Sequence, residues 1–273
     1  MADLVIETIS VPATFSTGTL SLIITAREVC KSVATGEGEL SILDNVNLDL
    51  TAGEVLAIVG PSGSGKSTLL GVLAGLDSAT SGTVSLLDQP LHNLDEDGRA
   101  AVRAGAVGFV FQSFQLLPGL SALENVMLPL ELANMADART RAQQQLAAVG
   151  LEHRLGHLPA QLSGGEQQRV AVARAFVSTP SVLFADEPTG NLDRATGDKI
   201  IDLMFRLRAE HNTALVLVTH DQNLASSCDR TLFMHDGSIR DTPVADAPAA
   251  GEPGANASGQ AAGQHESVQS APE

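Results

Sequence analysis

A glycine-rich segment carries the residues best suited to bind a polyphosphate: Gly60, Pro61, Ser62, Gly63, Ser64, Gly65, Lys66, Ser67 and Thr68. It contains the pattern G-x-x-x-x-G-K-S between Gly60 and Ser67. Its glycines allow close approach of phosphate oxygens to the backbone. Lys66 can reach the β- and γ-phosphates, and the Ser67 hydroxyl can bind Mg²⁺. The segment therefore predicts a site for a nucleoside triphosphate.

The flanks of this segment supply the elements that it needs. Residues 55–59, VLAIV, form an apolar run that predicts a strand buried on both faces of a parallel sheet. Residues 69–76 continue with an apolar pattern compatible with a helix. The free N–H groups of that helix start would face the phosphates. The alternative, an ordinary glycine-rich turn with an exposed lysine, is disfavoured because both flanks agree with the loop.

Other apolar runs end in polar residues that suit phosphate chemistry. They are residues 107–111 before Gln112, 181–185 before Asp186 and Glu187, and 214–219 before His220. Asp186 is suited to hold Mg²⁺ through water, and Glu187 is suited to act as the base for an attacking water. The alternatives are a solvated acid pair for Asp186 and Glu187 and, for His220 taken alone, a structural histidine.

Strands and helices are expected to alternate along the chain. Further strands are expected at residues 22–33, 41–50 and 82–87, and helical patterns at 95–106, 163–176 and 200–210. Ser163 and Glu166 have the spacing of a capping box, which predicts a helix start. The alternation predicts an α/β domain with a mainly parallel sheet.

Composition divides the chain into a folded domain and two flanking segments. Residues 1–24 are expected to be an N-terminal extension, and residues 25–240 the folded domain. A small helical subdomain is predicted within it, at residues of about 113–164. This segment is rich in Ala, Leu, Gln and Arg and is punctuated by Pro118, Pro129 and Pro159. Residues 241–273 contain no Lys or Arg and are expected to be a disordered acidic tail.

The charge and the cysteine content of the chain restrict the class of protein to which it can belong. Lys and Arg number 16 against 32 Asp and Glu, and the net charge of −16 disfavours nucleic acid as a partner. Cys30 and Cys228 match no metal or disulfide spacing, so free thiols in a reducing cytosol are expected. The sequence shows no apolar run of about 18 residues and no signal-peptide pattern, so a soluble cytoplasmic protein is expected.

The stretch Leu162–Gln167, LSGGEQ, together with Gln112, Asp186, Glu187 and His220, resembles the ATP-binding-cassette (ABC) ATPases. The resemblance covers about residues 25–240. It implies a P-loop NTPase (RecA-like) core with a mainly parallel sheet, a small antiparallel β subdomain and an inserted helical subdomain. It also implies ATP and Mg²⁺ as cofactors, hydrolysis to ADP and phosphate, and a homodimer around two ATP–Mg²⁺.

The resemblance also implies roles for individual residues. Gln112 would ligate Mg²⁺ with Ser67 and Asp186 and would couple the site to a transmembrane partner. His220 would contact the γ-phosphate beside the base Glu187.

Residues outside the glycine-rich loop would complete nucleotide binding. Ser163, Gly164 and Gly165 would bind ATP across the dimer, and Asp193 matches a loop that reaches across it. Many relatives stack an aromatic residue on adenine, and this chain has Val33 at that place. Val33 can give an apolar contact but no π-stacking.

Within the family, residues 111–118, 162–169 and 184–193 resemble the lipoprotein-release and macrolide-export branch. Residues 158–169 and 90–93 look closest to its YbbA-type subgroup. This resemblance implies a MacB/FtsX-like permease with a large extracytoplasmic domain, used for export or for lipid or lipoprotein extraction. The ATPase would lie on the cytoplasmic face of the inner membrane.

Two alternatives remain for the function. A soluble ABC ATPase of DNA repair, chromosome maintenance or translation typically has an inserted coiled coil, zinc-binding cysteines or two cassettes, and the sequence has none of these. A regulatory nucleotide-binding module without turnover would lack Glu187 or His220, and both are present. We therefore expect a transporter ATPase subunit.

Overall fold

The computed structural model describes residues 21–36 and 38–240. Strand β1 begins at Leu22, so residues 22–24 of the expected N-terminal extension belong to the folded domain. Residues 1–20 of that extension and the expected tail, 241–273, lie outside the described residues. No helix within the described ranges is long and apolar enough to cross a membrane.

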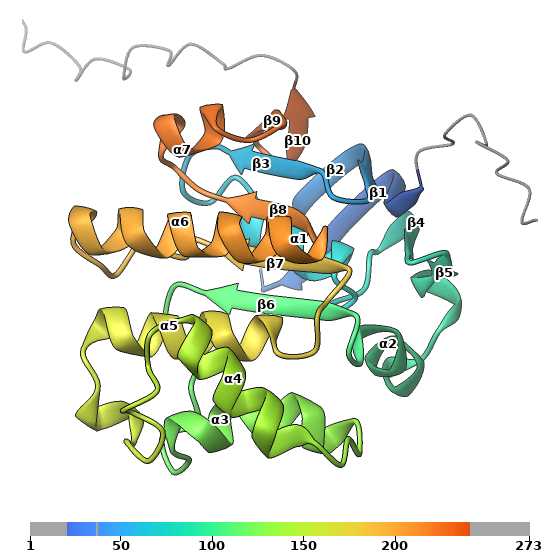
Figure 1. The fold of residues 1–273 in the computed structure, drawn as a ribbon. Helices are drawn as coiled ribbons and strands as arrows, with labels where there is room; N and C mark the ends of the chain where they lie inside the picture. Colours follow the sequence, from blue (N-terminus) through green and yellow to red (C-terminus); the bar gives the residue numbers. More distant parts are fainter. Residues whose placement is uncertain (1–20, 37, 241–273) are drawn as a thin grey trace, which may run out of the picture. The chain divides into compact units, whose positions relative to one another are not determined.

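The larger sheet within the described residues has the strand order β10-β9-β3-β8-β7-β6 (Figure 1). Its strands are β3 (Val55–Val59), β6 (Val107–Phe111), β7 (Val182–Asp186), β8 (Ala214–Val218), β9 (Arg230–His235) and β10 (Ser238–Arg240). All neighbours pair in parallel except β10, which is antiparallel to β9. The expected mainly parallel sheet is confirmed. Strands β9 and β10, which mix polar and apolar residues, were not predicted.

A second, antiparallel sheet has the order β2-β1-β4-β5. Its strands are β1 (Leu22–Thr35), β2 (Gly38–Thr51), β4 (Ser81–Leu86) and β5 (Gln89–Pro90). This sheet confirms the antiparallel β part of the expected fold.

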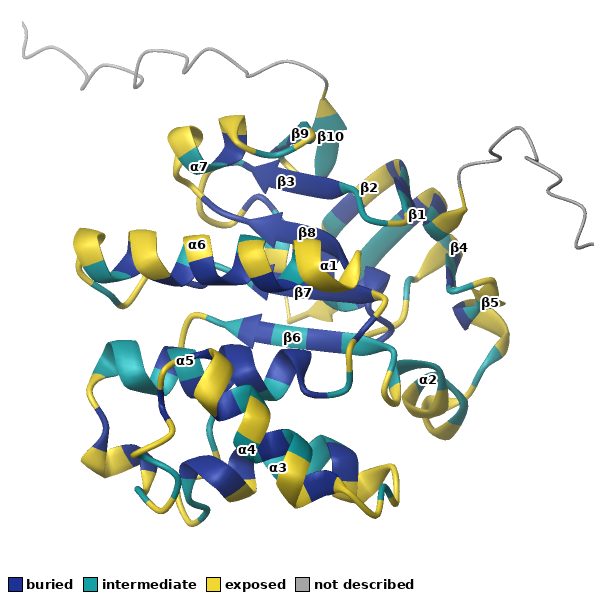
Figure 2. Cartoon of the chain, viewed as in Figure 1, coloured by how far each residue is buried: buried dark blue, intermediate teal, exposed yellow. Residues whose placement is uncertain are grey.

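The two faces of the parallel sheet belong to two different hydrophobic cores. On β7, Leu183 and Ala185 pack into a core shared with helices of the 122–176 region. Val182 and Phe184 point the other way, into a core shared with the antiparallel sheet and helix α1 (Lys66–Leu73). This alternation is the period of two of a β-strand. Figure 2 shows β3, β7 and β8 buried along their length, with exposed residues on the outer faces of the helices.

The remaining helices surround this sheet. They are α2 (Glu96–Arg103), α3 (Ala122–Leu132), α4 (Ala138–Ala148), α5 (Gly164–Phe176), α6 (Arg194–His211) and α7 (Gln222–Ser226), with the short 3-10 turns η1 (Leu91–Asn93) and η2 (Pro159–Gln161). In Figure 1, α3, α4 and α5 gather beside β6 at one edge of the sheet. Helices α3 and α4 fall within residues 113–164, where a helical subdomain is expected.

One helix boundary and the place of one proline differ from the sequence-based expectation. Helix α6 begins at Arg194 rather than at residue 200, because the Asp193 carboxylate caps it by accepting the backbone N–H of Thr196 at 3.0 Å. Its polar first turns gave no apolar signal. Pro129 lies inside α3 instead of interrupting the segment, and α3 ends at Leu132, within the next turn.

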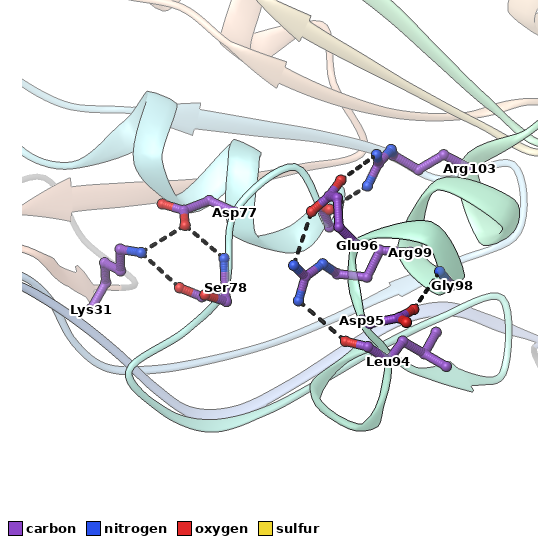
Figure 3. Close-up of polar contacts among 10 residues, drawn as sticks. Lys31, Asp77, Ser78, Leu94, Asp95, Glu96, Gly98, Arg99 and Arg103 are labelled. Carbon is purple, nitrogen blue, oxygen red and sulfur yellow. Dashed lines mark hydrogen bonds and ion pairs between the residues drawn. The ribbon is translucent and has the colours of Figure 1, made fainter.

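One ion pair and several hydrogen bonds hold the turn that follows α1 (Figure 3). Lys31 of β1 donates to Asp77 at 2.7 Å and to the carbonyl of Ser78 at 2.8 Å. On the other side, Arg103 of α2 donates to the carbonyl of Gly75 and pairs with Glu96 at 3.0 Å. The helix that begins at the glycine-rich loop is therefore tied at its far end to both neighbouring elements.

The loop between β6 and α3 is organised by one buried amide. Asn125 is fully buried, and its Oδ1 accepts the backbone N–H of Leu117 at 2.8 Å. Its Nδ2 lies within hydrogen-bond distance of the carbonyls of Leu117, Leu120 and Ser121. The side chain thus pairs the N–H of Leu117 and the carbonyl of Leu120, and adds a second hydrogen bond to the carbonyls of Leu117 and Ser121, which also accept backbone N–H groups.

We expect Asn125→Ala to lower the free energy of unfolding by about 1–3 kcal/mol, because it removes the hydrogen bonds of a buried amide and leaves the N–H of Leu117 and the carbonyl of Leu120 without these partners. Urea unfolding followed by circular dichroism measures this, since the chain lacks Trp and Tyr. Gln144→Ala, at an exposed position of α4, is the control and should change stability by less than about 0.5 kcal/mol. Equal effects of the two substitutions would contradict the role of Asn125.

Candidate nucleotide-binding site

The glycine-rich loop connects the end of β3 to the start of α1 and is shaped by its glycines. Gly65 caps α1 with a left-handed φ of 97°. A Cβ at Gly60 would lie 2.1 Å from the carbonyl oxygen of Met234, which no side chain tolerates. The loop therefore packs directly against the end of β9, and only glycine fits at these two positions.

The Lys66 ammonium lies inside this loop. Its Nζ donates to the carbonyl oxygens of Gly60 at 2.9 Å and Pro61 at 2.7 Å. Burial lowers the pKa of Lys66, and the nearby charges of Glu187 and Asp186 oppose that effect. The ammonium is thus held where phosphate oxygens of a bound nucleotide would compete with two backbone carbonyls.

A cavity of about 680 Å³ opens in front of the loop. The predicted residues that line it are Gly60, Ser62, Gly63, Gly65, Lys66, Ser67, Thr68, Gln112, Asp186, Glu187 and His220. They come from the carboxyl ends of β3, β6, β7 and β8 and from the start of α1. The structure thus brings together residues that are far apart in the sequence, as the parallel strand ends predict.

Other predicted residues do not line this cavity. Ser64, within the loop, is buried. Val33 pairs in register with Leu40, and Leu40 and Ile42 are the apolar residues of β2 that line the cavity. In a single chain, Val33 is therefore one strand removed from the cavity wall. Pro61 contributes its carbonyl to Lys66 rather than a lining side chain.

Glu187 and His220 form a close pair at the cavity wall. Nδ1 of His220 lies 2.9 Å from both carboxylate oxygens of Glu187. Glu187 has a left-handed φ of 46°, and its backbone N–H donates to the carbonyl of Val218 at 3.0 Å. The carboxylate is thus turned toward the end of β8, beside the space in front of Lys66 and Ser67.

The donor set fits a magnesium–nucleotide complex better than a metal alone. Among the described residues, no cluster of three or more His, Cys, Asp or Glu side chains could hold a metal ion. The cavity offers the Ser67 hydroxyl, the Gln112 amide and the Asp186 carboxylate. Mg²⁺ is commonly held by one or two carboxylates together with substrate phosphates, so this set suits it.

The start of α5 lies apart from this cavity. Ser163, Gly164 and Gly165 are absent from its lining. The Ser163 hydroxyl accepts the backbone N–H of Glu166 at 3.3 Å, and the Glu166 carboxylate accepts the backbone N–H of Ser163 at 2.8 Å, which confirms the capping box. A Cβ at Gly165 would lie 2.6 Å from Thr196 of α6, so this glycine also allows α5 and α6 to touch.

A parallel sheet whose strand ends surround a glycine-rich loop, a lysine and two acids defines a P-loop nucleotide-binding protein. The comparisons identify which kind. The family model described as ABC transporter matches residues 43–190. The chain is 60% identical over 221 residues to YbbA, an ABC transporter ATP-binding protein of Escherichia coli (strain K12), covering 80% of this chain and 97% of YbbA.

More distant relatives are also ATP-binding proteins of this kind. LolD of Legionella pneumophila (strain Paris), a lipoprotein-releasing system ATP-binding protein, is 51% identical over 220 residues, 80% of this chain and 97% of LolD. The ATP-binding cassette MJ0796, solved as a dimer with ADP and Pi, matches with a TM-score of 0.74 and 42% identity over 79% of this chain and 96% of that chain.

The chain belongs to the ABC transporter family and is an ATP-hydrolysing subunit of that family. The expected resemblance to YbbA-type and lipoprotein-release ATPases is confirmed.

Sequence reasoning missed several residues that hold the site loops. Asn191 bonds to Gln112 from 79 positions away. Gln168 of α5 donates to the carbonyl of Pro188, next to Glu187. Arg174 of α5 donates to the carbonyls of Phe114 and Gln115, which both have left-handed φ. No local pattern indicates these contacts, since each joins segments that meet only in the folded domain.

The capping box at α5 makes stability depend on pH. Hydrogen bonds from the backbone and hydroxyl of Ser163, together with Arg154, lower the pKa of Glu166 from 4.5 to about 2. Because the folded-state pKa is depressed, the ionised carboxylate stabilises the fold above pH 4.5, and this contribution is lost as the pH falls toward 2.

We therefore expect Glu166→Gln to be less stable than wild type by about 1–2 kcal/mol at neutral pH. The difference should shrink below pH 4.5. Chemical unfolding at a series of pH values measures it, with Glu152→Gln, at an exposed position after α4, as the control. A difference that stayed constant down to pH 3 would contradict the assignment.

Proposed function

We propose that two copies of this chain bind two ATP–Mg²⁺ between them and that hydrolysis reopens the dimer. The observation that carries the proposal is the separation of the two half-sites: the cavity holds Lys66 and Glu187, whereas Ser163 and the first helical residues, Gly164 and Gly165, lie outside it. A helix N-terminus with free amides binds phosphate. The relative MJ0796, solved as a dimer bound to ADP and Pi, supports a dimeric form.

The cavity residues divide into phosphate-binding and metal-binding groups. The amides of Gly63 and Gly65 and the Lys66 ammonium would hold the β- and γ-phosphates. Ser67, Gln112 and Asp186 would hold Mg²⁺, which neutralises charge on the phosphates when bound.

Residues from the edges of the site would complete nucleotide binding. Asp193 and the Ser163–Gly165 segment would act on the nucleotide held by the opposite copy. Leu40, which lines the cavity, would give adenine an apolar contact, and Val33, its partner on the adjacent strand, would extend that contact at the cavity edge.

Glu187 would act as the general base. It would orient a water molecule, take its proton as the water oxygen bonds to the γ-phosphorus, and leave the β–γ bridging oxygen to depart with ADP. Both of its oxygens face His220 in the present structure. Binding of the γ-phosphate would draw the exposed His220 away and free the carboxylate for that water.

A membrane permease with a large extracytoplasmic domain would be the partner and would hold the ATPase at the cytoplasmic face of the inner membrane. LolD, a similar protein, belongs to a lipoprotein-releasing system, which supports this class of partner. A groove of about 470 Å³ between α2, β6 and α3 is a suitable docking place. It is lined by Phe111, adjacent to Gln112, and by Leu132, which is 75% exposed.

We expect Glu187→Gln to retain ATP binding while hydrolysis falls about 10²- to 10⁴-fold, because the base is lost. With ATP and Mg²⁺, this variant should accumulate as a dimer in light scattering coupled to gel filtration. Glu152→Gln, which lies outside the cavity, should hydrolyse ATP at the wild-type rate. Hydrolysis by Glu187→Gln at the wild-type rate would refute the base assignment.

The Glu187→Gln protein can serve as bait in a pull-down from detergent-solubilised membranes in the presence of ATP. We expect a permease with few membrane spans and a large outer domain to co-purify with it. Mass spectrometry identifies it. Adding Leu132→Asp to the bait should reduce recovery without preventing ATP binding, because it places a charge in the apolar groove. Recovery of only soluble or nucleic-acid-associated proteins would instead favour the soluble ABC class.

A further inference from the structure

Gln112 is held by a single side chain from another loop. Asn191, between β7 and α6, donates through Nδ2 to the backbone carbonyl of Gln112 at 2.9 Å. The Gln112 Nε2 in turn donates to Oδ1 of Asn191 at 3.3 Å. One amide therefore fixes both the backbone and the side chain of Gln112.

The donor and acceptor roles in this pair are not interchangeable. A backbone carbonyl only accepts, so the group of Asn191 that faces it must be the NH₂. That orientation turns the side-chain oxygen of Asn191 toward the side-chain amide of Gln112. An oxygen only accepts hydrogen bonds, so the Gln112 group that faces it must be the NH₂. The end of Gln112 that faces Asn191 is thus its nitrogen, and its carbonyl oxygen remains available. Oxygen is the atom that Mg²⁺ requires.

Packing also limits where the Gln112 amide can lie. A Cβ at Gly190 would lie 2.7 Å from Nε2 and 3.0 Å from Cδ of Gln112. The Gln112 amide therefore rests directly on the Gly190 backbone, and a larger residue would displace it. Asn191 itself is exposed, so its hydrogen bonds do not serve to satisfy a buried polar group of the core.

We propose that Asn191 is a positioning residue that presents the Gln112 carbonyl oxygen to the Mg²⁺ of the bound nucleotide. The inference rests on the proposed role of Gln112 as a metal ligand and adds the residue that orients it. Residues that orient a metal ligand typically contribute 10- to 100-fold in metal affinity. Asn191 also lies two positions before Asp193, the cap of α6, so the metal site and the start of α6 share one short segment.

The test measures nucleotide binding rather than turnover. All proteins carry Glu187→Gln, so that ATP is not consumed, and are kept dilute enough to remain monomeric. The dissociation constant of a fluorescent ATP analogue, mant-ATP, is measured once with Mg²⁺ and once with EDTA. The ratio of the two gives the gain in affinity that depends on Mg²⁺. The variants are Asn191→Ala, Gln112→Ala, the two combined, and Asn93→Ala, an exposed asparagine of η1, as the control.

We expect Asn191→Ala to lower the Mg²⁺-dependent gain about 10-fold or more while its affinity in EDTA stays within about twofold of the parent. The combined variant should match Gln112→Ala alone, because Asn191 acts through Gln112. Asn93→Ala should match the parent.

Each other result has a distinct meaning. If Gln112→Ala lowers the gain and Asn191→Ala does not, the positioning role is wrong and the proposed metal site stands. If the two effects add in the combined variant, Asn191 acts by a route other than Gln112 and the inference is wrong. If Gln112→Ala leaves the gain unchanged, the proposed metal role of Gln112 fails and the inference fails with it.

Discussion

The burial of the central strands on both faces determines where this protein can do chemistry. Strands β3 and β8 are apolar and buried at every position, and β7 is buried up to its last residue, Asp186. Polar side chains can therefore enter the sheet only where strands end. Because the strands run parallel, Gly60, Asp186 and His220 all reach the same edge, and the phosphate loop, the acids and the histidine share one cavity.

Helix α5 links the loops around this cavity. Its first turn is capped by Ser163, its buried Gln168 holds the carbonyl of Pro188 beside Glu187, and Arg174 in its last turn holds the carbonyl of Gln115 beyond Gln112. The helix that carries the segment proposed to bind the nucleotide of the opposite copy thus also holds two loops of its own cavity. A shift of α5 cannot leave those loops unaffected, since each is bonded to it directly.

A structural feature could be predicted from the sequence when the residues that determine it lie close together in the chain. The glycine-rich loop, the capping box and the buried strands are set by residues within about ten positions of one another, so spacing and periodicity reveal them. The Asn191–Gln112 bond, the lining of the cavity by Leu40 and the start of α6 at Arg194 depend on packing between distant segments. The polar residues among these carry no periodic signal, and the pattern of Leu40 does not say which cavity it lines; only the folded domain shows these partners.

At Glu187, the residue type that would best stabilise the left-handed backbone differs from the one that the proposed reaction needs. A non-glycine residue there costs about 1 kcal/mol, which glycine would avoid. Selection for thermal tolerance alone would therefore favour glycine at the position where we propose that hydrolysis uses a carboxylate. Directed evolution for thermal stability would therefore have to screen for ATP hydrolysis in every round. Without that screen, it would select more stable variants that no longer hydrolyse ATP.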